Sequence, residues 1–333
     1  MPRRIDAWER AEQGGKDGAR DMAKVTVVGS GFVGMTTAQR IVEDGLADVC
    51  LIDVIEGKPQ GIALDLMQSG PVRGYSCRVQ GTNEPKDTAG SDLVIVTAGV
   101  PRKPGMDRSD LLGVNGKIVN AVADYVRAGS PKAIVLVVTN PLDTMVYQAR
   151  ARLDFPPERV IGMAGVLDSA RFRAFIAMEL NVSFECVHAM VLGGHGDSMV
   201  PLPRYSTVSG ISIEELLPKE TIDRLVTRTR NGGAEIVNLL KTGSAYYAPA
   251  ASVVEMARSI LRDERRLLPC AAWLTGQYGQ KDIYLGVPCV LGGKGVEKVV
   301  ELKLSDADTK SLANSADAIR KDLALLKQMG LLS

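Results

Sequence analysis

The stretch KVTVVGSGFVG, residues 24–34, decides the fold when it is combined with Asp53. Its β-branched valines predict a buried strand, and three glycines follow at the spacing G-x-G-x-x-G before a segment of helical character. Asp53 closes the next hydrophobic run, VCLIDV at 49–54, nineteen residues after the last of these glycines. This order is typical of a dinucleotide-binding unit, because an acidic residue at the second strand end accepts hydrogen bonds from a ribose. A plain strand, turn and helix is the alternative, since the spacing also arises by chance among 34 glycines.

Each glycine of the motif has a separate expected role in holding a dinucleotide. Gly29 makes the tight turn, Gly31 lets the backbone approach a pyrophosphate, and Gly34 lets the helix pack closely on the strand. The helix N-terminus then meets the phosphates with free N–H groups and a partial positive charge. Asp53 repels a 2′-phosphate, so the sequence predicts NAD rather than NADP. The motif residues predicted to bind this cofactor are Gly29, Ser30, Gly31, Phe32, Val33, Gly34 and Asp53.

Length and composition predict an ordinary globular protein with two lobes. At 333 residues the chain exceeds the size at which one core usually keeps growing. Hydrophobic residues make up 45% and charged residues 24%, and the formal net charge is +1. This balance gives no electrostatic reason to expect nucleic acid or an anionic membrane as a partner. No apolar run approaches the roughly 18 residues of a membrane span, so the chain is expected to be soluble.

Five cysteines are scattered along the chain and never form a C-x-x-C pair. An odd, scattered set argues against a disulfide framework and against a zinc site, and most of these residues lie in hydrophobic runs where buried thiols are expected. Residues 1–23 mix basic and acidic side chains without an apolar run, so they fit neither a secretory nor a transit peptide. We expect a disordered N-terminal extension and a reducing cytoplasm as the compartment.

The hydrophobic pattern changes near residue 163. Before it, continuous apolar runs alternate with helix-length segments, which predicts a parallel sheet covered on both faces with right-handed crossovers. After it, helices mix with shorter strands. We therefore expect an α/β protein, with a Rossmann-type parallel-sheet domain over 24–163 and an α+β substrate-binding domain over 164–333. Later strands of the first domain are expected at 49–54, 77–82, 92–99, 133–141 and 159–165. In the second domain we expect a strand over 187–194, two helices within 219–262 and a helix over 306–329.

Three residues of the second half are candidates for acid–base and anion-binding chemistry. His195, in VLGGHGDSMVP, is flanked by glycines after a predicted strand, where a ligand can approach closely, as an acid/base requires. An ordinary loop histidine is the alternative, and the other histidine, His188, is expected to be structural. Asp168 and Arg171 stand three apart on one predicted helix face, where such neighbours project together. A surface ion pair is the alternative for these two.

The loop VTAGVPRKPGMDR, residues 96–108, supplies further cations. It follows a predicted strand end and carries Arg102, Lys103 and Arg108. Ligands of open α/β sheets bind beyond the carboxyl ends of strands, so a loop with few apolar anchors at this place is a candidate lid. A solvated basic loop is the alternative.

Five motifs in the order GSGFVG, AGVPRKPGMDR, VTNPLD, GVLDSAR and GGHGD resemble the malate and lactate dehydrogenase superfamily. The resemblance covers nearly the whole chain from residue 24 and is closest to the malate dehydrogenases whose overall sequence is lactate-dehydrogenase-like. It implies reversible, NAD-dependent oxidation of a 2-hydroxy acid by hydride transfer and a place in the tricarboxylic acid cycle. It also implies a homo-oligomer, a tetramer built as a dimer of dimers.

The resemblance assigns roles to individual residues. His195 matches the proton acceptor, and Asp168 matches the carboxylate that orients it. Arg171 matches the arginine that binds the C1 carboxylate, and Arg108 matches the one that polarises the reacting carbonyl. Asn140 matches the amide that donates to the substrate. The positions implied beside the nicotinamide are Asn115, Val138, Thr139 and Asn140.

Arg102 indicates the substrate within this resemblance. Lactate dehydrogenases carry a neutral glutamine at that lid position, whereas a second guanidinium fits a substrate with a second carboxylate, such as malate or oxaloacetate. A lactate or other 2-hydroxy-acid dehydrogenase is the alternative. NAD-dependent glycosidases need a metal, and the sequence contains no convincing cluster of metal ligands. A catalytically silent NAD-sensing protein would have no need of His195, Asp168 and the matching arginines.

Two segments indicate an interface between subunits. GIALDLMQSG at 61–70 and YYAPAASVVEMARSIL at 246–261 carry more apolar residues than a single buried helical stripe needs. Helices at the interface of a homo-oligomer have this composition.

Overall fold

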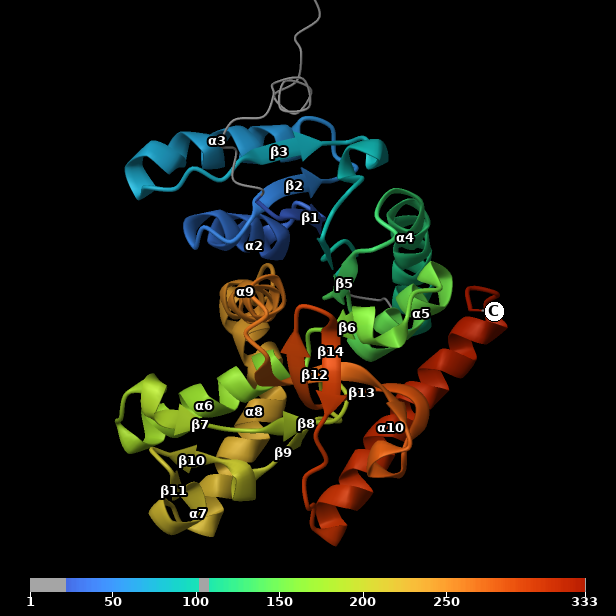
Figure 1. Ribbon diagram of the computed structural model, residues 1–333. Helices are drawn as coiled ribbons and strands as arrows, with labels where there is room; N and C mark the ends of the chain where they lie inside the picture. The colour runs from blue at the N-terminus through green and yellow to red at the C-terminus, as the bar shows by residue number, and fades with distance from the viewer. Residues whose placement is uncertain (1–21, 102–107, 333) are drawn as a thin grey trace, which may run out of the picture.

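The computed structural model describes residues 22–101 and 108–332 (Figure 1). Within them the largest sheet has nine strands in the order β14-β13-β12-β6-β5-β4-β1-β2-β3. Strands β1 to β6 are parallel, and the strand order reverses direction beside β1. This is the doubly wound Rossmann arrangement that the sequence predicts. The six strands are β1 Lys24–Val28, β2 Asp48–Ile52, β3 Val79–Thr82, β4 Leu93–Val96, β5 Ile134–Val137 and β6 Val160–Gly162.

The parallel strands read as continuous apolar runs because both faces of the sheet are buried. In β1, Val25 and Val27 belong to the core on one face, and Val28 belongs to the core on the other. Helices from the first half of the chain pack on both faces of the parallel strands (Figure 1). These are α2 Phe32–Glu43 and α3 Lys58–Arg73 on the first face, and α4 Arg108–Gly129 and α5 Leu142–Leu153 on the second.

The second half of the chain adds helices and short strands below the parallel sheet in the view of Figure 1. The two long helices and the final helix that the sequence predicts are confirmed. The elements are α6 Gly165–Leu180, β7 Val187–His188, β8 Val191–Leu192, β9 Val200–Pro201, β10 Thr207–Val208, β11 Ile211–Ser212, α7 Ile213–Leu216, α8 Lys219–Leu240, α9 Tyr247–Leu261, β12 Arg266–Thr275, β13 Lys281–Gly292, β14 Gly295–Val299 and α10 Asp306–Gln328.

The segment 187–194, predicted as one strand, forms two separate strands. β7 pairs with β10, whereas β8 pairs with β9 in a different sheet. The single-strand prediction was wrong because the chain changes pairing partners between His188 and Val191, and the apolar pattern carries no signal for that change.

Three antiparallel strands extend the main sheet beyond β6. β12 pairs with β13, and β13 pairs with β14. β12 also pairs with β6 through Ala271 and Gly162. A Cβ on Gly162 would lie 2.8 Å from that of Ala271, so glycine permits this close approach. The sheet thus joins the two predicted domains, and the boundary between them stays a prediction.

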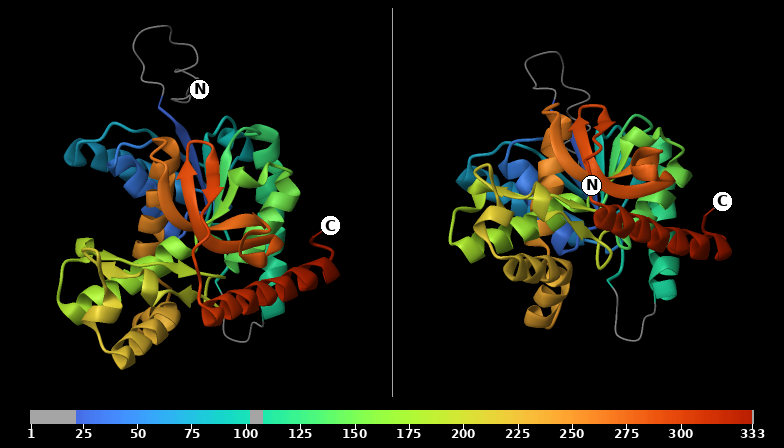
Figure 2. Two further views of the ribbon diagram at one scale, coloured as in Figure 1. Left: turned by 60° about the horizontal axis from the view of Figure 1, so that its bottom comes forward. Right: turned by 90° about the horizontal axis from the view of Figure 1, so that it is seen from below.

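Helix α10 crosses one end of the molecule (Figure 2). It contacts α4, α5, β9 and β13. Ser305 begins it as an N-cap, accepting a hydrogen bond from the backbone N–H of Asp308 at 3.1 Å. This placement brings Ser315, in the middle of the helix, beside the loop that follows β8.

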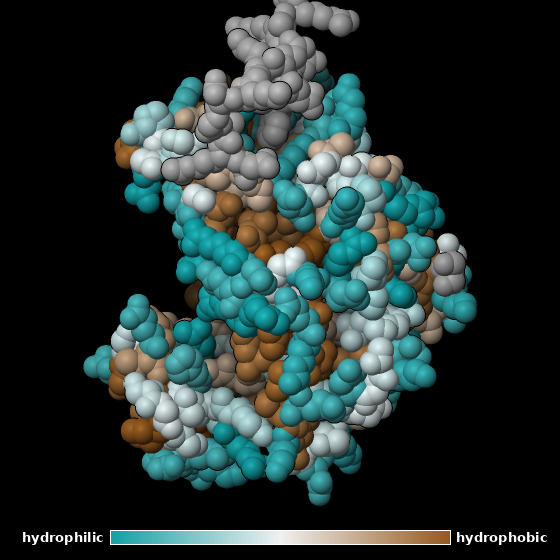
Figure 3. Space-filling model, in the orientation of Figure 1, coloured by the Kyte–Doolittle hydropathy of each residue, from teal (hydrophilic) through white to brown (hydrophobic). Residues whose placement is uncertain are grey.

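The two segments with an apolar excess differ in their burial. The apolar residues of α9 are mostly buried inside the chain, where the helix packs against α2. Helix α3 instead exposes Leu64 (60%) and Val72 (86%). On the face shown in Figure 3, apolar residues gather along the centre and hydrophilic residues surround them. Among the described helices, none is both long and apolar enough to cross a membrane.

Candidate active site

The carboxyl ends of the parallel strands bring three predicted loops to one edge of the sheet. β1 leads into the glycine loop at Gly29, β4 leads into Thr97, and β5 leads into a turn at Val138. The N–H of Thr97 donates to the carbonyl of Val28 at 2.8 Å, and the N–H of Val138 donates to the carbonyl of Val96 at 2.9 Å. These backbone bonds hold the three loops side by side, at the edge where open α/β sheets bind ligands.

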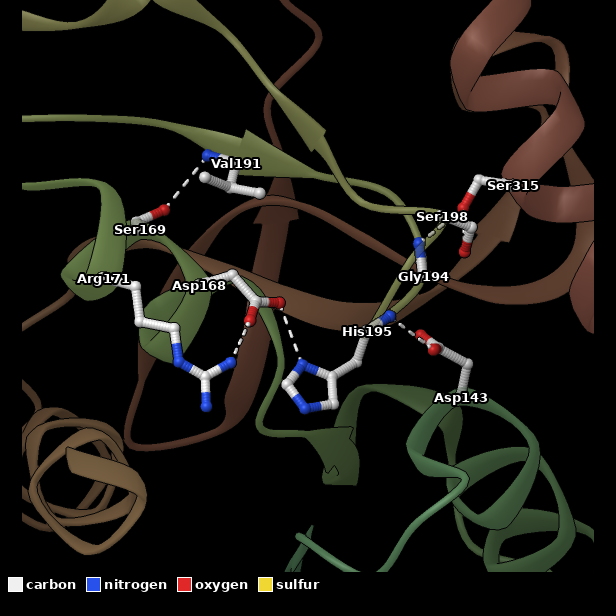
Figure 4. Close-up of polar contacts among 9 residues, drawn as sticks. All are labelled: Asp143, Asp168, Ser169, Arg171, Val191, Gly194, His195, Ser198 and Ser315. Carbon is white, nitrogen blue, oxygen red and sulfur yellow. Dashed lines mark hydrogen bonds and ion pairs between the residues drawn. The ribbon is translucent and has the colours of Figure 1, made fainter. Parts of the chain in front are cut away.

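Asp168 links the two other predicted catalytic groups. Its Oδ2 lies 2.9 Å from Nδ1 of His195, and its Oδ1 lies 3.3 Å from Nη1 of Arg171. Figure 4 shows the imidazole and the guanidinium converging on this carboxylate. The Asp168 side chain is only 2% exposed and that of Arg171 13%. The predicted pair on the helix face is therefore an internal one and not a surface ion pair.

The charge of Asp168 sets the protonation of the imidazole. Burial by itself lowers the pKa of His195, but the charge and hydrogen bond of Asp168 outweigh burial and raise the pKa above its ordinary value. The nearby Arg171 opposes this effect, and Asp143 adds to it. We assign the proton of the neutral ring to Nδ1 from its contact with the carboxylate, which leaves Nε2 as an acceptor.

Gly232 in α8 makes room for Arg171, whereas a side chain at Gly233 would only come into ordinary contact with it. A Cβ on Gly232 would lie 3.2 Å from Cδ of Arg171, and a Cβ on Gly233 would lie 3.5 Å from Nη2. A glycine within a helix costs roughly 0.5–1 kcal/mol relative to alanine, so space for the arginine gives a physical reason for Gly232. Burial lowers the pKa of Arg171, and its Nε has no hydrogen-bond partner among the described residues. A desolvated guanidinium with an unused donor is suited to a carboxylate ligand.

The glycine loop has the geometry that its motif predicts. Gly29 has a φ of +99°, and a Cβ there would lie 2.9 Å from the backbone nitrogen of Ala98. A Cβ on Gly34 would lie 1.8 Å from the carbonyl oxygen of Gly29, so only glycine allows α2 to pack so closely. A Cβ on Gly31 would meet no described atom within 4 Å. The chain itself therefore requires Gly29 and Gly34, whereas the bare backbone at Gly31 faces open space that a ligand could fill.

The first turn of α2 completes this loop. It begins at Phe32 and Val33, whose backbone N–H groups lie at a helix N-terminus, where no carbonyl precedes them within the helix. Such a terminus binds phosphate groups. The ring of Phe32 is 59% exposed and stacks on that of Tyr246, with centroids 5.1 Å apart.

The Asp53 carboxylate is fixed next to the glycine loop. Its Oδ2 accepts hydrogen bonds from the backbone N–H of Ser30 at 2.6 Å and from the Ser30 hydroxyl at 2.7 Å. Its Oδ1 accepts from the N–H of Ile55 at 3.0 Å. Burial by itself raises the pKa of Asp53, but these hydrogen bonds and the charge of Lys58 lower it overall. The end of β2 therefore presents an ionised acceptor, which suits a ribose diol and repels a 2′-phosphate.

Two family models cover both halves of the chain. The lactate/malate dehydrogenase, NAD binding domain, matches residues 23–162, and the lactate/malate dehydrogenase, alpha/beta C-terminal domain, matches residues 165–329. The chain belongs to the lactate/malate dehydrogenase family. Its first half is an NAD-binding domain of that family, and the chain is an NAD-dependent oxidoreductase.

Individual relatives agree with the family assignment. The malate dehydrogenase of Roseiflexus sp. (strain RS-1) is 54% identical over 306 residues, which span 92% of this chain and 99% of that protein. The crystal structure of Cryptosporidium parvum malate dehydrogenase superposes with a TM-score of 0.90 at 44% identity, covering 92% of this chain and 99% of that one. The lactate dehydrogenase from the same organism, complexed with lactic acid and β-nicotinamide adenine dinucleotide, gives a TM-score of 0.90 at 42% identity, with coverages of 93% and 99%.

Within this dehydrogenase fold, Asn115 joins two of the loops. Its Oδ1 accepts from the N–H of Val100 at 2.8 Å, and its Nδ2 donates to the carbonyl of Asn140 at 2.7 Å. The hydroxyl of Thr139 donates to the carbonyl of Ala98 at 2.6 Å. Backbone groups therefore occupy the side chains of Asn115 and Thr139, whereas the side chain of Asn140 is exposed at the site.

Two of the predicted arginines are not placed by the structure. Arg102 lies outside the described residues. Arg108 begins α4, but its side chain also lies outside them. The roles expected for both residues stay predictions.

The structure adds three polar residues that the sequence did not reveal. Asp143 accepts from the backbone N–H of His195 at 2.8 Å, and Ser315 accepts from that of Gly194 at 2.7 Å and contacts Ser198 (Figure 4). Asp143 lies in the VTNPLD motif, which was the only available signal. No local pattern marks Ser315, because its contact spans 121 residues of sequence.

The remaining histidine, the cysteines and the hollow at the other end of the sheet lie apart from this site in the described part of the chain. His188 lies on β7 with an exposed side chain, where its backbone pairs with Thr207. A hollow at the amino ends of the strands is lined by Ala23, Asp92 and Val296 among others, and none of the predicted site residues lies there. Over residues 22–101 and 108–332, no three His, Cys, Asp or Glu side chains are placed to hold a metal ion. The five cysteines, all within these residues, are free thiols, and only Cys186 is not fully buried.

Proposed function

We propose that this chain is an NAD-dependent malate dehydrogenase that reversibly oxidises (S)-malate to oxaloacetate, with His195 as the general base. The observation that carries the proposal is the contact of Asp168 with both the His195 imidazole and the Arg171 guanidinium. This contact supports the proposal because the imidazole proposed as the acid/base group lies beside the guanidinium proposed to bind a carboxylate. The relatives that match nearly the whole chain at 52–56% identity are malate dehydrogenases, which supports the same substrate.

The proton follows the hydrogen bonds of the imidazole. In oxidation, neutral His195 accepts the proton of the C2 hydroxyl at Nε2 while the C2–H bond breaks with its electron pair and the C2–O bond becomes a carbonyl. Asp168 stabilises the imidazolium that forms. In reduction, the imidazolium returns this proton to the carbonyl oxygen. NAD, when bound, supplies the hydride acceptor for oxidation.

The arginines orient the substrate in this proposal. Arg171 binds the C1 carboxylate, because its side chain keeps some exposure and its two terminal nitrogens can donate to both carboxylate oxygens. Arg108 polarises the reacting carbonyl, and Asn140 donates an amide hydrogen bond. Arg102 pairs with the distal carboxylate, which lactate lacks, and so selects a dicarboxylate.

Residues 24–163 bind NAD in this proposal, and residues 164–333 supply the catalytic histidine. The pyrophosphate lies at the bare backbone of Gly31 and the first turn of α2, and Asp53 accepts hydrogen bonds from the adenine ribose. Asn115 and the turn formed by Val138, Thr139 and Asn140 lie beside the nicotinamide, and Asn115 acts there by holding the turn through its hydrogen bond to the carbonyl of Asn140. We also propose a homotetramer built as a dimer of dimers, for which the exposed apolar side chains of α3 are a candidate contact.

One assay tests the proposed reaction. NADH absorbance is followed with oxaloacetate, pyruvate and a branched 2-keto acid side by side, using equal concentrations of native protein. We expect kcat/KM to be highest for oxaloacetate. A preference for pyruvate or the branched acid would favour the alternative 2-hydroxy-acid dehydrogenase, and binding of NADH without turnover of any of them would favour a catalytically silent sensor.

A further inference from the structure

Asp143 is a buried carboxylate placed against the backbone of the proposed base. It occupies the second position of α5, and its side chain is 5% exposed. Its Oδ2 accepts the hydrogen bond from the His195 N–H at 2.8 Å. Its Oδ1 has no hydrogen-bond partner among the described residues. The roles implied by the family resemblance do not include this residue.

The loop that carries His195 needs such an anchor. Gly193 and Gly196 have φ values of +83° and +113°, and glycine allows many backbone conformations. Two helices restrict the loop from one side (Figure 4). Asp143 of α5 holds His195, and Ser315 of α10 accepts from the Gly194 N–H at 2.7 Å. The direction of the imidazole therefore depends on contacts from outside the loop.

The group that accepts from the His195 backbone N–H is a carboxylate, although a hydrogen bond to a backbone N–H does not require a charged acceptor. A neutral acceptor would satisfy the N–H at lower cost, because burial of a carboxylate is unfavourable. Burial raises the pKa of Asp143 to about 6, although the hydrogen bond and charge of His195 oppose this effect. At neutral pH the carboxylate is therefore mostly ionised beside the imidazole.

Among the described residues, three charged groups determine whether the protonated or the neutral form of this imidazole is favoured. Asp168 lies on α6 with Arg171 one turn further, and Asp143 faces His195 from α5. The two carboxylates favour the imidazolium, and the guanidinium opposes it. The arginine side chains predicted for the loop after β4 lie outside the described residues.

We propose that Asp143 is a positioning residue of the reaction: it fixes the backbone of His195 and, when ionised, adds a second negative charge that favours the protonated imidazole. This inference rests on the proposed role of His195 as the base. Two substitutions separate the effect of the backbone contact from the effect of the charge. Asp143→Asn keeps an acceptor oxygen but removes the charge, and Asp143→Ala removes both.

The first test does not depend on catalysis. The chain has two histidines, so NMR of ¹³C-labelled imidazole rings gives two titration curves, and His195→Asn identifies the one that belongs to His195. In Asp143→Asn we expect the His195 midpoint to move to lower pH by about half a unit or more, because a favourable negative charge is lost. The matched control is Asp322→Asn, which removes another buried carboxylate, on α10, that is not among the groups acting on His195. A midpoint in Asp143→Asn that coincides with the native and control curves would overturn the charge effect.

The second test measures the positioning effect by kinetics. For Asp143→Ala, kcat for oxaloacetate reduction should fall by about tenfold or more with a smaller change in KM, because a displaced base slows the chemical step. Asp143→Asn should retain more kcat than Asp143→Ala, and its kcat/KM should decline at lower pH than that of native protein. If Asp143→Ala fails to fold in a thermal melt, this comparison of Asp143→Asn with native protein decides the question. Native kcat in Asp143→Ala, or an unmoved pH profile in Asp143→Asn, would overturn the inference. Native protein that turns over no 2-keto acid would refute the proposed function instead, and the imidazole titration would still report on Asp143.

Discussion

Asp168→Asn should disable both directions of the proposed reaction without unfolding the protein. Asparagine has the same shape and keeps an acceptor for the Nδ1–H of His195, so the loss is mainly one of charge. The Asp168 carboxylate and the imidazole are in contact, with 2.9 Å between Oδ2 and Nδ1, and both side chains are mostly buried. Two unit charges about 4 Å apart interact by about 4 kcal/mol at the effective dielectric constant of about 20 that suits such sites.

This energy stabilises the imidazolium, which forms during oxidation and is required at the start of reduction. A tenfold change corresponds to about 1.4 kcal/mol, so complete loss predicts a fall in kcat/KM on the order of 10² to 10³ in each direction. Asp168 also pairs with Arg171, so part of the loss should appear as a higher KM. Without the charge of Asp168, burial lowers the pKa of His195. Reduction needs the protonated ring, so kcat/KM for oxaloacetate reduction should decline at lower pH in Asp168→Asn than in native protein.

The assay is the pH dependence of kcat/KM for oxaloacetate reduction and malate oxidation, followed by NADH absorbance, with circular dichroism to verify the fold. His195→Asn, which removes the base itself, gives the reference for complete loss. If Asp168→Asn retained kcat/KM within about threefold and its pH profile coincided with the native one, the role derived for Asp168 would be wrong.

Two further substitutions test the glycines at the site. Gly34→Ala should lower the free energy of unfolding, measured in urea, by about 3 kcal/mol or more, because its Cβ would lie 1.8 Å from the carbonyl oxygen of Gly29. The matched control is Gly31→Ala, whose Cβ meets no described atom within 4 Å. This control should keep native stability but bind NADH more weakly. Gly232→Ala should leave the free energy of unfolding unchanged or raise it by up to about 1 kcal/mol, because alanine has the higher helix propensity. It should also raise KM for oxaloacetate several-fold, because the new Cβ would lie 3.2 Å from Cδ of Arg171. A lower melting temperature with native KM would contradict the inference that Gly232 makes room for Arg171.

The parallel half of the fold could be predicted because its signals are local. Both faces of β1 are buried, so its valines read as one apolar run, and Gly29 and Gly34 after it stand where backbone packing leaves no room for a side chain. The second half gave weaker signals. Strands β7 and β8 have two residues each. The pairing of β12 with β6 involves a single residue pair, Ala271 and Gly162. Such contacts depend on how segments far apart in the sequence pack together, so they produce no periodic pattern of apolar residues.

The candidate site divides in the same way. The contact of Asp168 with Arg171 could be predicted from their spacing on one helix, and its meeting with His195 was implied by the family resemblance. Asp143 and Ser315 could not be predicted, because each bonds to a backbone N–H, and any residue except proline at the partner position would supply that group. The apolar excess of α9 was equally ambiguous, since its burial inside the chain and burial between subunits give the same composition.

The measurement that tests the central claim most directly is the ratio of kcat/KM for oxaloacetate to that for pyruvate, in native protein and in Arg102→Gln. In the proposed function, Arg102 pairs with the distal carboxylate in a closed site, and loss of one partner of such a pair costs about 2 to 5 kcal/mol. We therefore predict that kcat/KM for oxaloacetate falls by roughly thirty- to several-thousand-fold, whereas activity with pyruvate holds or rises because an unpaired buried charge is removed. An unchanged ratio would contradict the assignment of a dicarboxylate substrate.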